Sequence, residues 1–375
     1  MIENKFLILP ALTCFNHRGC KFIKVQKSEN ASPVFKISAF SLINKFILKL
    51  KLFKLLQFLA FLGLGLVLFW LIYKDQDIDR IKSILKNDVN YTWIWVSVIL
   101  GILSHISRAM RWSLMIEPLG RKPGLLNTFL SVMIGYLMNL VIPRMGEISR
   151  CGILARYEKI SFTRLVGTVV TERIIDILMM LLLTALVIIT QFGALLEFLE
   201  NNPDIKGKLS GLALSPWFFA GAVLLFVLLF LSRNKIRKSA FFSRIRQTVL
   251  KFGEGLKTIK DMRNKRAFIF HTLFIWLMYF LMLYVSFFAF DFTSHLSVPA
   301  GLTTFVLGSY GMVAPVQGGI GAWHFMVIQS LFVYGIAKPD AVVFAFLAHS
   351  TMTSMLIIIG LISLVVLPFI NRRTA

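Results

Sequence analysis

The sequence predicts an all-α polytopic membrane protein with about six full transmembrane helices and two opposed, re-entrant broken-helix hairpins. Apolar residues make up 57% of the chain and charged residues 16%, with a mean hydropathy of +0.75. A soluble domain is closer to about half apolar and one quarter charged. The apolar residues gather in stretches of about 20, the length at which a helix spans a bilayer. Two further stretches are broken by proline and glycine.

The first 44 residues differ from the rest of the chain. Residues 16–38 are polar and basic, and the short apolar run that contains Pro10 lacks the small-residue cleavage site of a signal peptide. We therefore expect residues 1–44 to be a poorly ordered basic extension and residues 45–371 to form the membrane domain. The three cysteines lack metal-ligand spacing, so neither a metal nor another cofactor is expected.

Six apolar stretches are predicted to cross the membrane. They are Leu55–Tyr73, Trp93–Ile106, Leu165–Thr190, Phe218–Ser232, Phe268–Phe290 and Ala341–Phe369. The second is short because Arg108 closes it. Two more stretches are interrupted: Leu125–Ile142 runs into Pro143, and Pro299–Ala314 runs into Pro315 before apolar sequence resumes. Breaks of this kind persist in a membrane only where protein or a cavity satisfies the freed backbone groups.

The loop charges decide how these segments thread, because cytoplasmic loops are rich in Lys and Arg. The loop Lys74–Asn90 carries four acids and four bases and is placed outside, whereas Arg233–Arg266 carries twelve bases against two acids and is placed inside. If Leu125–Ile142 crossed fully, five basic residues between positions 144 and 164 would lie outside. A hairpin removes this conflict. The prediction is a bacterial cytoplasmic (inner) membrane protein with both termini in the cytoplasm.

The two broken segments resemble each other. Tyr136-x-Met138 is followed by Pro143-x-x-Gly146, and Tyr310-x-Met312 is followed by Pro315-x-x-Gly318. Each segment belongs to a unit of three spans and one hairpin, and the units enter from opposite sides. This is the layout of an inverted repeat, in which paired broken segments mark a transport site. The alternative is a chance likeness between two breaks.

The first hairpin contains four polar candidates for binding a lipid phosphate. They are Asn139, Arg144, Glu147 and Arg150. Charges near membrane depth are costly and indicate function by default. Arginine suits phosphate because its planar fork donates two parallel hydrogen bonds. The alternative is an interfacial loop whose charges pair with each other.

Two neighbouring segments add further candidates. Arg108 and Arg111 share a face at the end of the second span, where they could bind a headgroup or simply extend to the interface. Glu172, Arg173 and Asp176 begin the next span. There they could orient the arginines of the first hairpin or carry a coupling proton. The alternative is that the acids are stabilising charges near a helix N-terminus that pair with arginines of the preceding loop.

The second hairpin offers backbone groups. Gln317, Gly318 and Gly319 could present amides at the start of a half-helix as an anion site, or could form a tight turn only. His324 follows and could titrate near neutral pH, or could be an interfacial residue. The segment 233–267 predicts a basic amphipathic helix on the cytoplasmic leaflet or a connector under the bundle. No catalytic motif is present, so an enzyme is not expected, and no basic domain indicates nucleic acid.

Four motifs in order resemble the lysylphosphatidylglycerol synthase transmembrane-region family, also called flippase-like domain proteins, over about residues 45–370. They are Arg108-x-x-Arg111-Trp112, Asn139-x-x-x-Pro143-Arg144-x-Gly146-Glu147-x-x-Arg150, Glu172-Arg173-x-x-Asp176 and Pro315-x-x-Gly318-Gly319-Ile320-Gly321. The resemblance implies lipid translocation or binding without the synthase reaction, because the sequence holds no soluble aminoacyl transferase domain. It keeps polyprenyl-phosphate substrates open. An acidic residue usually follows the glycine run in this family, whereas Trp323 and His324 stand there in this chain.

Three functional hypotheses follow. The first is a flippase-like translocase of anionic phospholipid or polyprenyl-phosphate-linked lipid. The second is a membrane partner subunit of a lipid-modifying or glycosyl transferase. The third is an intramembrane lipid-processing enzyme with Glu147 or Asp176 as the acid or base. The expected partners are membrane lipids and a transferase, and the sequence leaves the lipid and the oligomeric state open.

Overall fold

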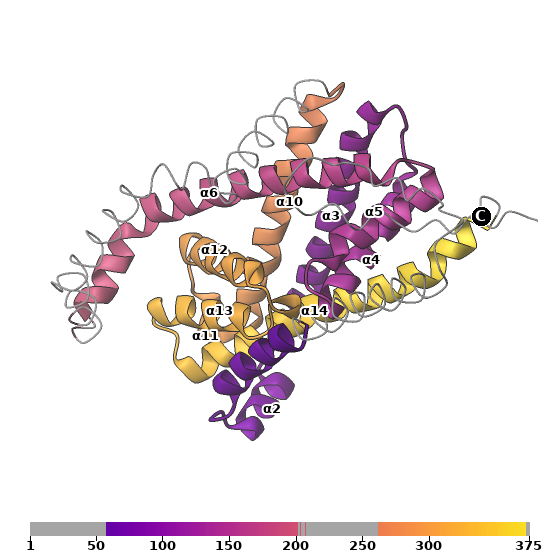
Figure 1. Ribbon diagram of the computed structural model, residues 1–375. Coiled ribbons are helices and arrows are strands. Elements are labelled where there is room, and N and C mark those ends of the chain that lie inside the picture. Colours follow the sequence, from indigo (N-terminus) through magenta and orange to yellow (C-terminus); the bar gives the residue numbers. More distant parts are fainter. Residues whose placement is uncertain (1–57, 202, 204–206, 208–261, 373–375) are drawn as a thin grey trace, which may run out of the picture. The chain divides into compact units, whose positions relative to one another are not determined.

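A computed structural model describes residues 58–201, 203, 207 and 262–372 of the chain (Figure 1). In these residues all regular elements are helices and no strand occurs, which confirms the predicted all-α class. Contacts divide the chain into residues 1–56 and 57–375, and everything below concerns the second unit. The predicted extension 1–44, the span Phe218–Ser232 and nearly all of the amphipathic segment 233–267 lie outside the described residues.

Four described helices are long and apolar enough to cross a membrane. They are α3 (Tyr91–Ile116), α6 (Phe162–Asn201), α10 (Lys265–Ser286) and α14 (Lys338–Ile370). A fifth span counts if Phe58–Tyr73 is joined to α2 (Ile78–Asn87), which is bent from it by 83°. Large apolar side chains face outward along these helices, such as Ile189, which is 79% exposed. Such surfaces require lipid, so the protein is a multi-pass membrane protein.

Two predicted boundaries were wrong. The second span does not end at Ile106, because α3 continues to Ile116 with its arginines inside the protein. The region Lys74–Asn90 is not a plain loop, since it contains α2. Asp77 caps α2 by accepting hydrogen bonds from two backbone amides, and its Ile81 packs on the core. A short helix, α11 (Asp291–Ser294), follows α10.

The first broken segment forms a helical hairpin. Its arms are α4 (Leu125–Val141) and α5 (Met145–Glu158), with 17 and 14 residues. At 1.5 Å per residue each arm is shorter than the hydrocarbon core of about 30 Å. Glu158 closes the open end, because its Oε1 accepts from Gly124 N at 3.1 Å and from Asn127 Nδ2 at 2.7 Å. The arms cross so closely at Gly146 that a Cβ there would overlap α4.

The second broken segment forms another hairpin, made of α12 (Val298–Val313), the 3-10 turn η3 (Gln317–Gly319) and α13 (Ala322–Val333). Its arms are joined near the open end by the Thr304 and Ser330 hydroxyls, 2.9 Å apart. Left-handed backbone makes the break possible, with φ values of 57°, 76° and 79° that glycine adopts without strain. These residues are Gly318, Gly319 and Gly321.

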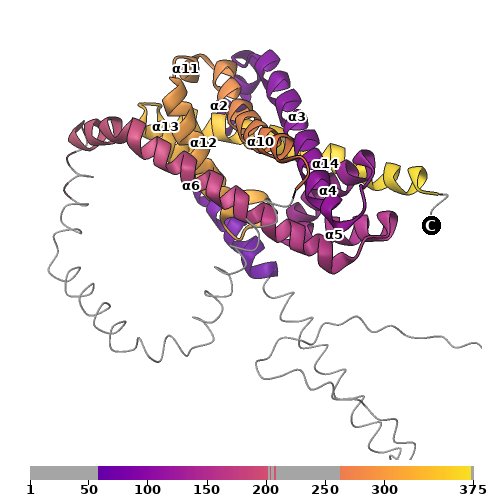
Figure 2. The same ribbon diagram turned by 90° about the horizontal axis from the view of Figure 1, so that it is seen from above.

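The hairpins enter from opposite ends of α14 and meet at their tips (Figures 1 and 2). The open end of α4/α5 lies at the C-terminal end of α14, where Asn127 and Asn371 bond reciprocally. The open end of α12/α13 lies beside the start of α14, where Arg80 pairs with Asp340 at 2.6 Å. Between these ends, α4 contacts η3. The opposed arrangement follows from these contacts, whereas internal symmetry stays a prediction.

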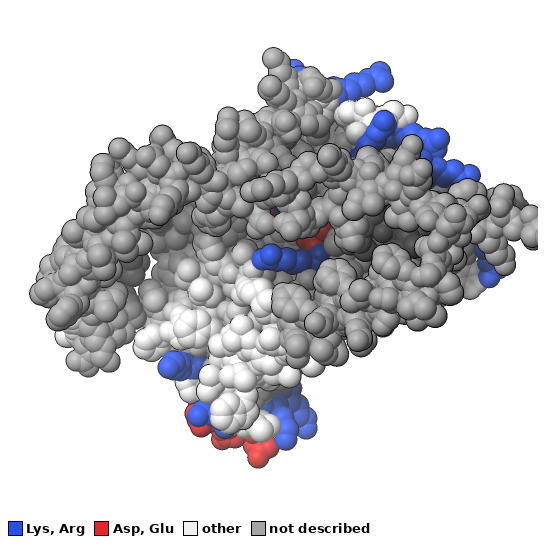
Figure 3. All heavy atoms as spheres, viewed as in Figure 1, with Lys and Arg blue, Asp and Glu red and all other residues white. Residues whose placement is uncertain are grey.

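The described surface is also asymmetric in charge. Charges of both signs gather over α2, whereas Lys and Arg predominate at the end near α3 and α5 (Figure 3). Exposed bases at the latter end include Arg121, Lys122, Arg156 and Lys159. This is the pattern that the positive-inside rule associates with a cytoplasmic face.

Candidate functional site

A buried cluster of charges lies where α3, α5 and α6 converge. Its centre is Glu172 on α6, which is fully buried. One carboxylate oxygen of Glu172 accepts from Arg108 Nη2 at 2.5 Å, and the other accepts from Arg150 Nη2 at 2.8 Å. Three helices are therefore joined at a single carboxylate.

A second carboxylate, Asp176, lies one turn further along α6. Its Oδ1 accepts from Arg111 Nη2 at 2.8 Å and its Oδ2 from Arg108 Nη2 at 2.9 Å. Because Glu172 and Asp176 are four residues apart, they share a helix face and both reach α3. Arg111 is fully buried, yet its Nε and Nη1 have no hydrogen-bond partner among the described residues. Unused donors on a buried guanidinium can bind an acceptor.

Local packing holds these side chains in place. Trp112 is fully buried between α3 and α6, and its Nε1 donates to Thr168 Oγ1 at 2.9 Å. The Arg150 guanidinium lies over the Trp112 ring, 4.7 Å from its centroid. Leu154 and Leu165, both fully buried, complete the apolar cluster beneath the charges. The cluster is therefore preorganised by the helix packing.

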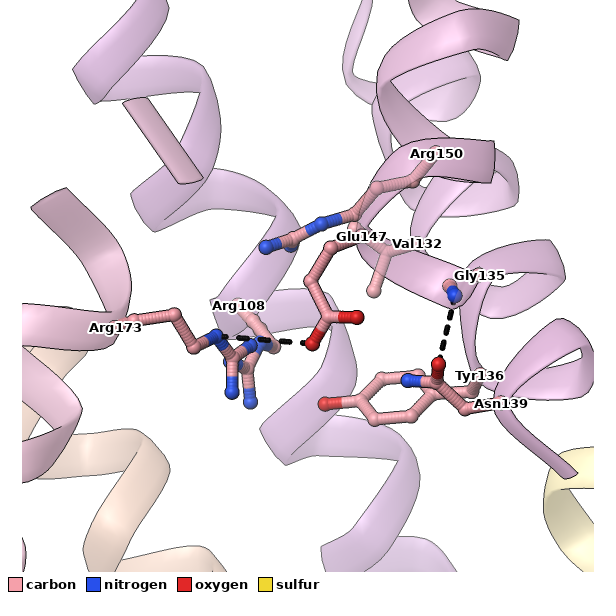
Figure 4. A pocket seen from close by; sticks show the side chains of 9 residues that line it. Arg108, Val132, Gly135, Tyr136, Asn139, Glu147, Arg150 and Arg173 are labelled. Atoms are coloured by element: carbon pink, nitrogen blue, oxygen red, sulfur yellow. Dashed lines mark hydrogen bonds and ion pairs between the residues drawn. The ribbon is translucent and has the colours of Figure 1, made fainter. Parts of the chain in front are cut away.

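Arg173 and Glu147 form the outer rim of the cluster (Figure 4). The Arg173 side chain is 44% exposed and the Glu147 side chain 30%, with Arg173 Nε 4.0 Å from Glu147 Oε1. Arg173 also lies 3.5 Å from Glu172 and 3.6 Å from Asp176. The second oxygen of Glu147 is buried and has no partner among the described residues. The rim is therefore the most loosely held part of the site.

The charges of the cluster do not cancel. Four arginines face three carboxylates, which leaves a surplus of one positive charge. The arginines are Arg108, Arg111, Arg150 and Arg173, and the carboxylates are Glu147, Glu172 and Asp176. Unpaired charge at membrane depth is costly. An anion brought to the rim would offset this surplus.

Between the rim and α4 lies a cavity of about 20 Å³. Its lining includes Arg108, Tyr136, Asn139, Glu147 and Arg150 (Figure 4). That volume holds roughly one water molecule, so a phosphate headgroup enters only if the rim opens. The Asn139 side chain is fixed, because its Oδ1 accepts from Gly146 N at 2.7 Å. Movement of α5 would therefore change the cavity directly.

Two tyrosines and a histidine extend the polar interior beyond the residues that were predicted. Tyr279 on α10 accepts from Arg108 Nη1 at 3.1 Å, and its hydroxyl lies 3.1 Å from that of Tyr136. The His105 ring packs on Tyr136, with 4.6 Å between centroids. Tyr136 belongs to the repeated Tyr-x-Met pattern, which was the available signal. Nothing in the sequence pointed to Tyr279 or His105.

The structure brings most of the predicted residues together and separates the others. Arg108, Arg111, Arg150, Glu172 and Asp176 form the core of the cluster, with Arg173, Glu147 and Asn139 around it, as described above. Arg144 is exposed at the tip of the first hairpin, where it adopts a φ of 64°. It is not among the residues that line the cavity.

The predicted residues of the second hairpin form a different environment. The amides there bond within the turn itself, with Ile320 N donating to Gln317 O at 3.1 Å and Gly321 N donating to His324 Nδ1 at 3.3 Å. Gln317, Gly318, Gly319 and His324 do not line the cavity of the arginine cluster. In the described ranges, no group of three or more metal-ligating side chains occurs.

Opposed hairpins, long apolar helices and a buried arginine cluster define a polytopic membrane protein with a charged interior. The sequence profile of the family described as "Lysylphosphatidylglycerol synthase TM region" matches residues 55–360, and the chain belongs to this family. This confirms the resemblance drawn from the four motifs.

One relative is the UPF0104 membrane protein MJ1595 of Methanocaldococcus jannaschii, which is 33% identical over 114 residues. The matched stretch covers 30% of this chain and 34% of that protein, so it spans about a third of the relative. No solved structure matches the chain.

Proposed function

We propose that this protein is a flippase-like translocase that binds the phosphate of an anionic phospholipid or a polyprenyl-phosphate-linked lipid. The observation that carries the proposal is the buried cluster of four arginines and three carboxylates with its one surplus positive charge. Guanidinium groups bind phosphate oxygens through paired, charge-assisted hydrogen bonds. A family named for the membrane region of a phospholipid synthase fits the same class of ligand.

Translocation needs a site that can open to either side. The arginine cluster adjoins the first hairpin, and the tips of the two hairpins meet. Broken helices around a central site are the usual arrangement in transporters that work by alternating access. In this proposal the small cavity corresponds to a closed state, and a headgroup would enter at the Glu147–Arg173 rim.

The ion pairs bear on the enzyme hypothesis. Glu172 and Asp176 each accept hydrogen bonds from two or more arginines, which stabilises their charged forms and makes them poor proton donors. Glu147 is held less tightly and is the remaining candidate for an acid or base. If a Glu147→Gln variant processes lipid at an unchanged rate, Glu147 has no such role. The alternative proposal is that the protein is a membrane partner subunit of a transferase. Co-purification with a transferase, without lipid transport by the protein alone, would support it.

Leaflet exchange of a headgroup-labelled lipid in reconstituted vesicles tests the proposal. Arg173→Gln removes a rim charge without leaving a fully buried carboxylate unpaired, so the variant should fold. We expect exchange to fall by about tenfold, which corresponds to the loss of one charged hydrogen bond of about 1.4 kcal/mol. Arg173→Lys should restore part of the rate because the charge returns without the fork.

Arg156→Gln is the matched control, because Arg156 is an exposed arginine on α5 that does not line the cavity of the cluster. It should exchange lipid at the wild-type rate. Exchange no faster than in empty vesicles, across anionic phospholipids and polyprenyl phosphates, would refute a translocase. Equal loss in Arg173→Gln and Arg156→Gln would instead mean that surface charge matters and the cluster does not.

A further inference from the structure

A pair of buried histidines lies at the tip of the second hairpin. His324 on α13 is 2% exposed and His349 on α14 is 4% exposed. Their rings are 4.5 Å apart between centroids. His349 Nε2 bonds to the carbonyl oxygen of Gly318 at 2.9 Å, which attaches α14 to the break in the hairpin. The arginine cluster uses neither residue.

The hydrogen bonds assign the tautomers of the pair. The Gly318 carbonyl can only accept, so His349 Nε2 carries a proton. In the neutral ring the base is then His349 Nδ1, 3.4 Å from the Thr353 hydroxyl. Conversely, His324 Nδ1 accepts from the Gly321 amide and must be unprotonated. The bond from Gly321 therefore requires a neutral His324, whereas the contacts of His349 fit both its neutral and its charged form.

The two rings are not equivalent toward a further proton. A proton on His349 Nδ1 leaves the bond to Gly318 intact and makes it charge-assisted, and the Thr353 hydroxyl can rotate to accept the new N–H. A proton on His324 Nδ1 would instead oppose the Gly321 N–H. Because like charges a few ångströms apart repel, the pair takes up one proton only.

We propose that His349, with His324 as its neutral neighbour, is a proton-binding site that fastens the tip of the second hairpin to α14. Proton uptake strengthens the His349–Gly318 bond, and proton release loosens the tip. The role in transport rests on the proposed function, because it supposes that the tip moves when lipid is carried. The proton site itself does not depend on that supposition.

Aromatic rings surround the pair on two sides. Trp323 lies 5.2 Å from the His349 ring, and Phe69 and Tyr73 lie 5.5 and 5.8 Å from the His324 ring. The Trp323 ring and the Gly318 carbonyl contact His349 itself, and both can stabilise a positive charge on that ring. The titratable groups that face the pair are Tyr73 of helix Phe58–Tyr73 and the two histidines themselves. No Asp, Glu, Lys or Arg of the described residues influences either ring.

Proton uptake can be measured without any lipid transport. The protein is labelled at histidine with nitrogen-15, placed in lipid nanodiscs and titrated by NMR from about pH 8 to about pH 4, the range around an ordinary histidine. His349→Gln and His324→Gln assign the two signals. We expect the His349 ring to take up one proton at Nδ1 while His324 stays neutral. No uptake by His349, or uptake by His324 instead, would overturn the site.

A second variant guards against a misfolded His349→Gln protein. Thr353→Val removes the hydroxyl that accepts the added proton's N–H, so the titration midpoint of His349 should fall by about one pH unit. An unchanged midpoint would contradict the assigned geometry. The exposed His295 supplies a control, because His295→Gln should leave both signals of the pair unchanged.

Amide hydrogen exchange then reports the mechanical consequence. After correction for intrinsic rates, exchange at residues 318–321 should be about fivefold slower with His349 protonated, which is the difference between a neutral and a charged hydrogen bond. His349→Gln should lose this pH dependence, and retention of it would refute the fastening role. A protein that shows proton uptake and slowed exchange but moves no lipid would support this site while overturning the proposed function.

Discussion

The two hairpins are stabilised at their helix breaks by different interactions. The α4/α5 hairpin is held by charge, because its Arg150 reaches the fully buried Glu172 on α6. The α12/α13 hairpin is held by backbone, with left-handed glycines at its break and a carbonyl bonded to His349. In the two proposals above, the first hairpin would contribute to a site for a charged ligand and the second would respond to a single proton.

The same contrast appears at the helix starts that follow the two breaks. In the second hairpin His324 occupies the third position of α13 and accepts from the amide of the capping residue, Gly321. Glutamate or glutamine does this in an ordinary capping box. A histidine therefore caps this helix in place of an acidic residue, and the tip of the second hairpin has no carboxylate at this position. The first hairpin keeps its acid, Glu147, in the first turn of α5.

Removing the charge of Glu172 should have the largest effect on stability, and that effect should be confined to the first hairpin. Glu172→Gln leaves Arg108 and Arg150 without their shared carboxylate, and breaking a buried ion pair costs about 3–5 kcal/mol. We expect a large loss of thermal stability in detergent and exposure of α5 to proteolysis, while α12/α13 stays protected. Glu117→Gln, a partly exposed acid beyond α3, should melt like wild type. Uniform destabilisation of both hairpins would show that they are not separate units.

A change confined to the second hairpin should have a smaller effect. Gly321→Ala places a Cβ 2.5 Å from Leu68 Cβ and 2.8 Å from the Gly65 carbonyl, at a φ of 79°. The left-handed backbone alone costs about 1–2 kcal/mol. Gly335→Ala is the control, because Gly335 has a φ of 84° with open space around it. The difference in melting temperature between these variants measures crowding at the tip, and equal melting would mean that the tip is loosely packed.

Much of this fold can be predicted from the sequence, because long apolar stretches and Pro/Gly breaks determine the local backbone structure directly. The positions of both hairpins and of five predicted spans follow from hydropathy. The end of α3 does not, since Arg108 and Arg111 are matched by acids more than 60 residues away. A hydropathy profile places the end of a span at such charges, because it does not include their ion-pair partners. The helix within Lys74–Asn90 was missed for a related reason. Its isoleucines have helical spacing, but charged residues separate them and hide the apolar pattern.

The sequence predicted most residues of the charged cluster and one of its contacts, that of Glu172 with an arginine of the first hairpin. Charged residues at membrane depth marked Arg108, Arg150 and Glu172 as candidates, but which acid meets which arginine depends on how α3 packs on α6. Tyr279 and His349 carried no signal, because a lone polar residue in an apolar helix is more often structural. Arg144 was favoured by its sequence neighbours, although its backbone at the hairpin tip directs it outward.

A last comparison concerns the close approach of the arms in the first hairpin. Gly146→Ala would press a methyl group against the Gly135 carbonyl and the Asn139 side chain, and overpacking of this kind costs about 1–3 kcal/mol. Gly152→Ala, on the same helix with open space around it, should stabilise the protein by up to about 1 kcal/mol, because alanine favours a helix. Thermal unfolding of the two variants should therefore shift in opposite directions. If both were stabilising, the arms would have to separate at little cost, and the first hairpin would depend on its charges alone.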